Sequence, residues 1–209
     1  MQKREIASNS QITVSLFDSV FPPTIKVVLD IPAPIEYVEY YVDPDHWSET
    51  QHIQDPFFAN WEVLHDLGPI SSKSSTLSSP SPPVSTLIGR RTTKRLLTFG
   101  RRDLIFACFK ESLPSLNSTR FAALSIDHPS HPPVDPDTPY TRAFQDLMIT
   151  ATSTSTSVTR VECLMKVDLG GNIPKWIFKK TVGQTGLMAF KAISKKAVES
   201  FKRGRMVTK

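Results

Sequence analysis

The stretch that most constrains the fold is 161–201, where a strand-like alternation runs directly into a long helix. The alternation breaks at the turn Asp168-Leu-Gly-Gly171, and Ile173-Pro174 then begins a helix that reaches almost to the C-terminus. A helix that directly follows a strand buries its apolar stripe on the sheet. We therefore predict a sheet that is covered by this terminal helix. The strand face expected to point inward carries Val161, Cys163, Met165 and Val167.

The apolar stripe of the terminal helix is interrupted by small residues. On a helical wheel of about 100° per residue the stripe is centred on Leu187, and Phe190 and Ser194 lie on the same side. Gly183 and Ala197 are part of the same stripe. These small residues either leave space for a ligand or allow close contact between the helix backbone and the sheet. We predict that Leu187, Phe190 and Ser194 face a cavity.

The rest of the chain reads as short strands joined by turns, which favours an antiparallel sheet of about eight strands. A short helix is expected at 35–42, and another helical turn follows Trp47. The segment 71–85 contains eight serines and three prolines, a composition that predicts a flexible loop inside the domain. The expected strands are 11–18, 24–31, 61–67, 84–97, 103–111, 121–127, 140–150 and 158–168.

Length and composition place the chain among single-domain globular proteins. Its 209 residues suffice for one core, with no apolar run long enough to span a bilayer and no apolar signal core at the start. We therefore expect a cytoplasmic protein. Cys108 and Cys163, the two cysteines, lie in apolar runs and are expected to be buried free thiols. The spacing of His128 and His131 resembles a metal motif, but a proline-rich loop explains it better, so no metal or cofactor is predicted.

The net charge of +5 is unevenly distributed. Residues 174–209 hold ten Lys/Arg and one acidic residue, giving +9, while the remainder of the chain carries −4. A basic terminal helix suggests an anionic partner, a membrane surface or nucleic acid, or else it is a solvated face. The basic residues between 90 and 102 alternate between strand faces, which argues against a nucleic-acid platform. Transient membrane docking is predicted for Lys179, Lys180, Lys195 and Lys196.

Several blocks of the chain, taken in order, resemble the START (steroidogenic acute regulatory protein-related lipid transfer) domain family. Each block is weak alone, but together they cover about 25–201. The family pattern also includes an N-terminal helix that this sequence lacks, although we treat 1–209 as one domain. The blocks are VEYYVDPDHW (Val38–Trp47), FGRRDLIF (Phe99–Phe106), Ser125–Pro129, Pro132-Pro133, Tyr140–Ala143 and Asp168–Pro174.

The resemblance implies an α+β helix-grip fold, in which a curved antiparallel sheet grips the C-terminal helix around a hydrophobic cavity. It implies that Leu104, Phe106 and Cys108 line this cavity, and that Arg142 donates a hydrogen bond to a lipid oxygen. The expected protein is a non-enzymatic monomer that binds one sterol, phospholipid or sphingolipid and carries it between membranes. Alternatives are a lipid-sensing module without transfer activity and, less favoured, a helix-grip enzyme. No catalytic acid or base is evident among the predicted lining residues.

Overall fold

The computed structural model describes residues 3–8, 12–17, 22–70, 84–95, 100–132, 140–171 and 173–204. Within them lie ten strands, three α-helices and two 3-10 turns. The N-terminal half contains β1 (Lys3–Ser8), β2 (Ile12–Phe17), β3 (Thr24–Ile31), α1 (Ile35–Val42), η1 (Pro44–His46), α2 (Trp47–Gln54), β4 (Phe58–Ile70) and β5 (Val84–Thr93). The C-terminal half contains β6 (Arg101–Leu113), η2 (Pro114–Leu116), β7 (Ser118–Ser125), β8 (Tyr140–Arg142), β9 (Phe144–Ser155), β10 (Val158–Asp168) and α3 (Lys175–Lys202).

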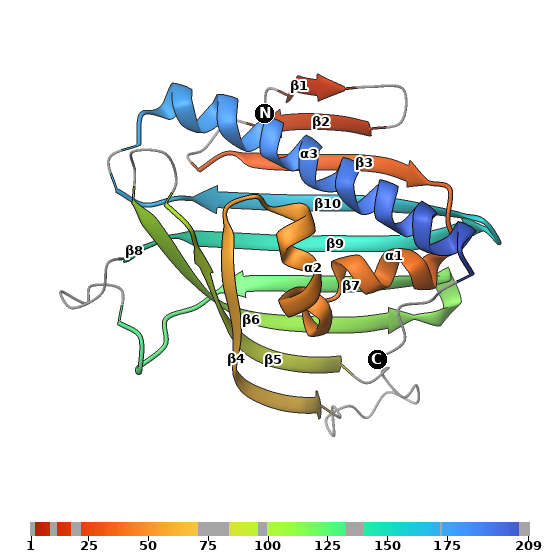
Figure 1. The fold of residues 1–209 in the computed structure, drawn as a ribbon, viewed down its shortest axis with the longest axis horizontal. Helices are drawn as coiled ribbons and strands as arrows, with labels where there is room; N and C mark the ends of the chain where they lie inside the picture. The colour runs from red at the N-terminus through yellow and green to blue at the C-terminus, as the bar shows by residue number, and fades with distance from the viewer. Residues whose placement is uncertain are drawn as a thin grey trace, which may run out of the picture.

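The strands form one open sheet with the order β1-β2-β3-β10-β9-β7-β6-β5-β4, and β8 lies off this path beside β6 (Figure 1). Neighbours along the path are antiparallel, whereas β8 runs parallel to β6. The pairing of β3 with β10 joins the first three strands of the chain to the last strand inside the sheet. Strand β10 therefore lies between β3 and β9, and α3, which follows it in the chain, crosses the face of the sheet.

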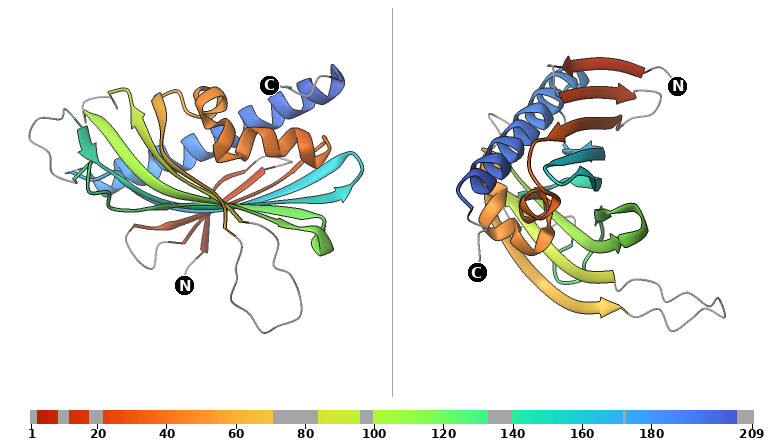
Figure 2. Two further views of the ribbon diagram at one scale, coloured as in Figure 1. Left: turned by 90° about the horizontal axis from the view of Figure 1, so that it is seen from below. Right: turned by 90° about the vertical axis from the view of Figure 1, so that its right-hand side faces the viewer.

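The sheet is curved, and all three α-helices lie on its concave side (Figure 2). Helix α3 runs diagonally across the sheet, with α1 and α2 between it and the β4–β7 side (Figure 1). The main core fills the space between α1, α3 and the central strands, with Val38, Val161 and Ile193 among its fully buried members. No helix among the described residues combines the length and apolarity needed to cross a membrane.

A smaller aromatic core lies at the β4–β6 end of the concave face. The rings of Trp47 and Trp61 meet edge to face with centroids 5.1 Å apart, and both lie near Phe106. The Trp61 ring covers Gly89 so closely that an added Cβ would lie 2.2 Å from it. Glycine at this strand position is therefore a packing requirement, because any side chain would displace the indole ring.

The sequence predicted β3, α1 and β10 with the observed boundaries, because their patterns are uninterrupted. Strand β1 was not expected, because it carries charged residues and lacks alternation, and β8, with three residues, was expected only as the start of a longer strand. The predicted strand 140–150 is split at Ala143, whose backbone N–H donates to the Asp103 carbonyl 2.9 Å away. That bond holds β8 on β6, while β9 pairs with β10. Most of the predicted loop, 71–83, lies outside the described residues.

Candidate functional site

A cavity of about 170 Å³ lies between α3 and the concave face of the sheet. On the same measure one water molecule needs about 15 Å³, so the space holds roughly ten times that volume. The floor comes from three strands, β6, β9 and β10, with apolar side chains from Leu104, Phe106, Ile149, Cys163, Met165 and Val167. The roof comes from the middle of α3, with Thr185, Gly186, Ala189, Phe190 and Ile193. Floor and roof together suit a hydrocarbon chain or ring system.

Charged and amide side chains gather at one end of this cavity, which we call the polar end. Asp55 forms an ion pair with Arg91, and each of the two side chains is 13% exposed. The Arg102 guanidinium donates to the carbonyls of Leu169 (2.5 Å) and Gly170 (3.5 Å), directly after β10. The polar end consists of Gln51, Gln54, Asp55, Arg91, Thr93 and Arg102. The cavity therefore offers an apolar body and a hydrogen-bonding end, the combination found in sites for amphipathic ligands.

Five of the ten predicted cavity residues line the observed cavity, namely Leu104, Phe106, Cys163, Met165 and Phe190. Burial raises the pKa of the Cys163 thiol to about 12 and also raises that of Cys108. Both cysteines are free and buried, as expected. A protonated, desolvated thiol acts as a small apolar group and not as a nucleophile.

Leu187 and Ser194 do not line the cavity, because the buried face of α3 is rotated by roughly 90° from the predicted stripe. In the part of α3 whose side chains are described, the buried positions are Gly186, Phe190, Ile193 and Ala197, with the spacing i, i+4, i+7, i+11. Leu187 and Ser194 are only half-buried beside this face. This spacing is present in the sequence. Because Gly186 and Ala197 are small and contribute little hydrophobicity, a stripe chosen by hydrophobicity centres on Leu187 instead.

Val161 and Cys108 share the inward face of their strands but lie beyond the cavity. Val161 is fully buried in the main core together with residues of α1. Cys108 is buried beside Asp43 and Pro44 at the start of η1. In both places the segment α1–η1 covers the sheet directly, so no space remains for a ligand.

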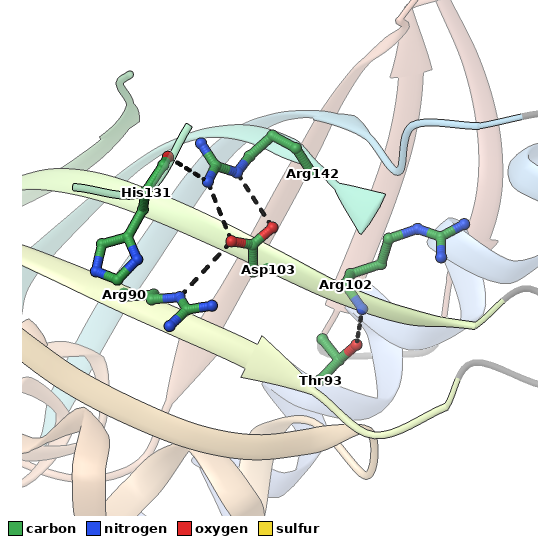
Figure 3. Close-up of polar contacts among 6 residues, drawn as sticks. All are labelled: Arg90, Thr93, Arg102, Asp103, His131 and Arg142. Carbon is green, nitrogen blue, oxygen red and sulfur yellow. Dashed lines mark hydrogen bonds and ion pairs between the residues drawn. The ribbon is translucent and has the colours of Figure 1, made fainter. Parts of the chain in front are cut away.

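Arg142 lies on the opposite side of the sheet from the cavity and is held by Asp103. Its Nε and Nη2 donate to the two carboxylate oxygens, both at 3.1 Å, and Nη2 also donates to the His131 carbonyl at 2.9 Å. Arg90 approaches the same carboxylate at 3.6 Å. Figure 3 shows Asp103 between these two arginines, with Arg102 pointing away from them. We call Arg90, Asp103 and Arg142 the Asp103 cluster; it joins strands and does not reach the cavity.

Of the four predicted docking lysines, Lys195 and Lys196 are exposed on the outer side of α3. Both lie near Glu199, at 4.0 and 3.4 Å respectively. The side chains of Lys179 and Lys180 lie outside the described residues. The His128–Pro–Ser–His131 segment forms a turn in which the His131 N–H donates to the His128 carbonyl, and no metal-binding group was found among the described residues.

The START domain family model matches residues 100–203. Among solved structures, human StAR-related lipid transfer protein 5 has a TM-score of 0.73 at 16% identity, over 94% of this chain and 86% of that one. Human STARD10 has a TM-score of 0.70 at 16% identity, over 97% of this chain and 75% of that one. The aromatase/cyclase Zhui from Streptomyces sp. R1128 reaches 0.50 at 8% identity, over 85% and 94%. No curated protein matches the sequence significantly. These similarities confirm the predicted helix-grip fold.

Proposed function

Because the chain belongs to the START domain family through residues 100–203, we propose that it binds one lipid beneath α3 and carries it between membranes. The cavity is the observation that supports this proposal, since its lining is mostly apolar and its charged side chains, Asp55, Arg91 and Arg102, lie at one end. Burying a chain of about sixteen carbons contributes on the order of 12 kcal/mol, at about 0.8 kcal/mol per CH₂. A lipid that leaves a bilayer loses a similar amount, so the cavity makes the exchange nearly neutral.

The test is to extract the purified protein with organic solvent, identify the released lipid by mass spectrometry, and measure transfer of that lipid between vesicles. We expect one lipid per chain, and transfer that rises in proportion to protein concentration. Stoichiometric binding without transfer would favour the sensing module. A protein that neither contains nor takes up any lipid would contradict the proposal.

An enzymatic role is less favoured by the chemistry of the lining. The similarity to an aromatase/cyclase raises the possibility, and the structure adds a carboxylate, Asp55, that the sequence had not placed there. This carboxylate is held by Arg91, and the Cys163 thiol is protonated at neutral pH. Neither group is therefore poised to remove a proton from a bound substrate.

We further propose that the outer face of α3 docks on anionic membranes. Met188, Lys191 and Lys195 have the spacing i, i+3, i+7 and share that face, where Met188 is 61% exposed and Lys195 76%. An apolar side chain among lysines is typical of helices that rest in a lipid headgroup layer. Docking there would bring the cavity roof to the membrane surface, where a lipid enters or leaves.

Changing Lys195 and Lys196 together to glutamate is expected to reduce binding to anionic vesicles at low salt by at least tenfold, and to slow transfer. Each lysine near such a surface contributes about 1 kcal/mol, and salt screens this contribution. Vesicle sedimentation at several salt and anionic-lipid contents is the measurement. Arg120→Glu with Arg160→Glu, on the strands, gives the same change in net charge as a control. Equal effects of the two double variants would indicate a general charge effect and not a docking face.

A further inference from the structure

The side chain of Gln51 faces the cavity, and its carboxamide has no hydrogen-bond partner among the described residues. Gln51 is 5% exposed and lines the cavity. Among the described residues its side chain makes no hydrogen bond, whereas other cavity glutamines are engaged: Gln54 donates to the Tyr41 carbonyl and Gln145 to the Met165 sulfur at 3.2 Å. Because this carboxamide opens onto the cavity, its N–H groups and its oxygen are available to a polar group that arrives with the ligand.

The surroundings of Gln51 define the chemistry of that group. Asp55 follows one helical turn later, and its backbone N–H donates to the backbone carbonyl of Gln51 at 2.8 Å. Asp55 is paired with Arg91, so donors and acceptors stand side by side and the pair carries no net charge. Arg102, at the same end, already donates to backbone carbonyls. A phosphate or carboxylate would use only the donors and would lie near the Asp55 carboxylate, whereas a hydroxyl uses both donors and acceptors.

Helix α2 also places an apolar surface beside this polar group. Trp47 lies one turn before Gln51 and lines the same cavity, with its ring near Phe106. Its own indole N–H is already bonded to the Val42 carbonyl at 3.2 Å, which leaves only its apolar surface for a ligand. A ligand that reaches Gln51 thus needs a bulky apolar body directly behind its polar group.

We propose that Gln51, with the Arg91–Asp55 pair, recognises the single uncharged hydroxyl of a lipid alcohol. This inference rests on the proposed function and narrows it, because it favours sterols or diacylglycerols over lipids with charged headgroups. Gln51 acts as the specificity-determining residue, since its amide both donates to and accepts from the hydroxyl. The apolar body of the lipid occupies the space between Phe106 and Phe190.

The test compares probes that share a skeleton, using displacement of a fluorescent fatty-acid-like probe from the purified full chain. The probes are cholesterol, its hydrocarbon analogue cholest-5-ene and cholesteryl sulfate, and in a second set dioleoylglycerol and dioleoyl phosphatidic acid. We expect the wild-type chain to prefer the alcohol of each set by about tenfold. Gln51→Leu should remove this preference by weakening alcohol binding about tenfold, a typical effect of one lost hydrogen bond, while cholest-5-ene binding stays unchanged.

Gln145→Leu is the matched control, because it removes another carboxamide of the lining that is already bonded within the protein. It should leave the preference for alcohols intact, and thermal unfolding should show both variants folded. An unchanged preference in Gln51→Leu would overturn the inference, as would tighter wild-type binding of the sulfate and the phosphatidic acid. In those two outcomes lipid binding itself stands. If no probe of either set binds, the inference is overturned, and the lipid extracted from the purified protein decides whether the proposed function stands.

Discussion

Replacing Gly186 by tryptophan is expected to abolish lipid loading while the protein remains folded. Gly186 lies in the cavity roof, and a Cβ added there meets no heavy atom within 4 Å. The indole would therefore extend into the cavity without a backbone clash and occupy the space of the ligand. Tryptophan also favours the helix over glycine at this position, by about 0.5 kcal/mol. Mass spectrometry of extracted lipid, with thermal unfolding measured in parallel, checks both parts of the prediction.

Gly186→Ala is the control, because it also raises helix propensity but does not fill the cavity. It should raise the free energy of unfolding by about 1 kcal/mol and retain lipid. Met165→Trp tests the same cavity from the floor and should likewise prevent loading. A folded Gly186→Trp variant with the wild-type amount of bound lipid would show that the ligand lies elsewhere.

The C-terminal half of the fold was predictable because its signals are local. The alternation in β10, the two glycines after it and Pro174 before α3 each specify structure over a few residues. Strand β4 was less predictable, since its register with β5 shifts at three places and breaks the alternation of inward and outward residues. The sequence suggested only residues 61–67 for a strand that runs from Phe58 to Ile70.

The floor of the cavity could be predicted from strand alternation, but the polar end could not. Gln51 lies on α2 and Asp55 directly follows it, in a segment that reads as polar and was expected to be no more than a helical turn. The contact of Asp55 with Arg91 joins residues 36 positions apart and depends on how α2 packs against the sheet beside β4. The sequence pointed to Arg142 as a cavity residue instead. The family resemblance identifies the motif around Arg142 but does not indicate whether its side chain faces the cavity or the opposite side of the sheet.

The placement of Arg142 leads to the largest expected effect on stability. Asp103→Ala should lower the free energy of unfolding by about 3–5 kcal/mol, because it leaves two buried guanidinium groups without their carboxylate. The Asp103 and Arg142 side chains are only 8% and 5% exposed, and the bidentate bond holds β8 against β6. The same strand end contacts the turn after β10, where a Cβ on Gly170 would lie 2.3 Å from the Arg142 carbonyl oxygen. Chemical denaturation is the measurement.

Glu111→Ala is the matched control on the same strand, because Glu111 pairs with Arg120 at 3.3 Å where both side chains are substantially exposed. Its removal should change the free energy of unfolding by less than about 1 kcal/mol. The double variant Asp103→Leu with Arg142→Met should recover part of the loss, since apolar residues of similar size can replace a buried ion pair. If Asp103→Ala costs no more than Glu111→Ala, the Asp103 cluster does not hold the strands, and the role of Asp103 must be sought outside stability.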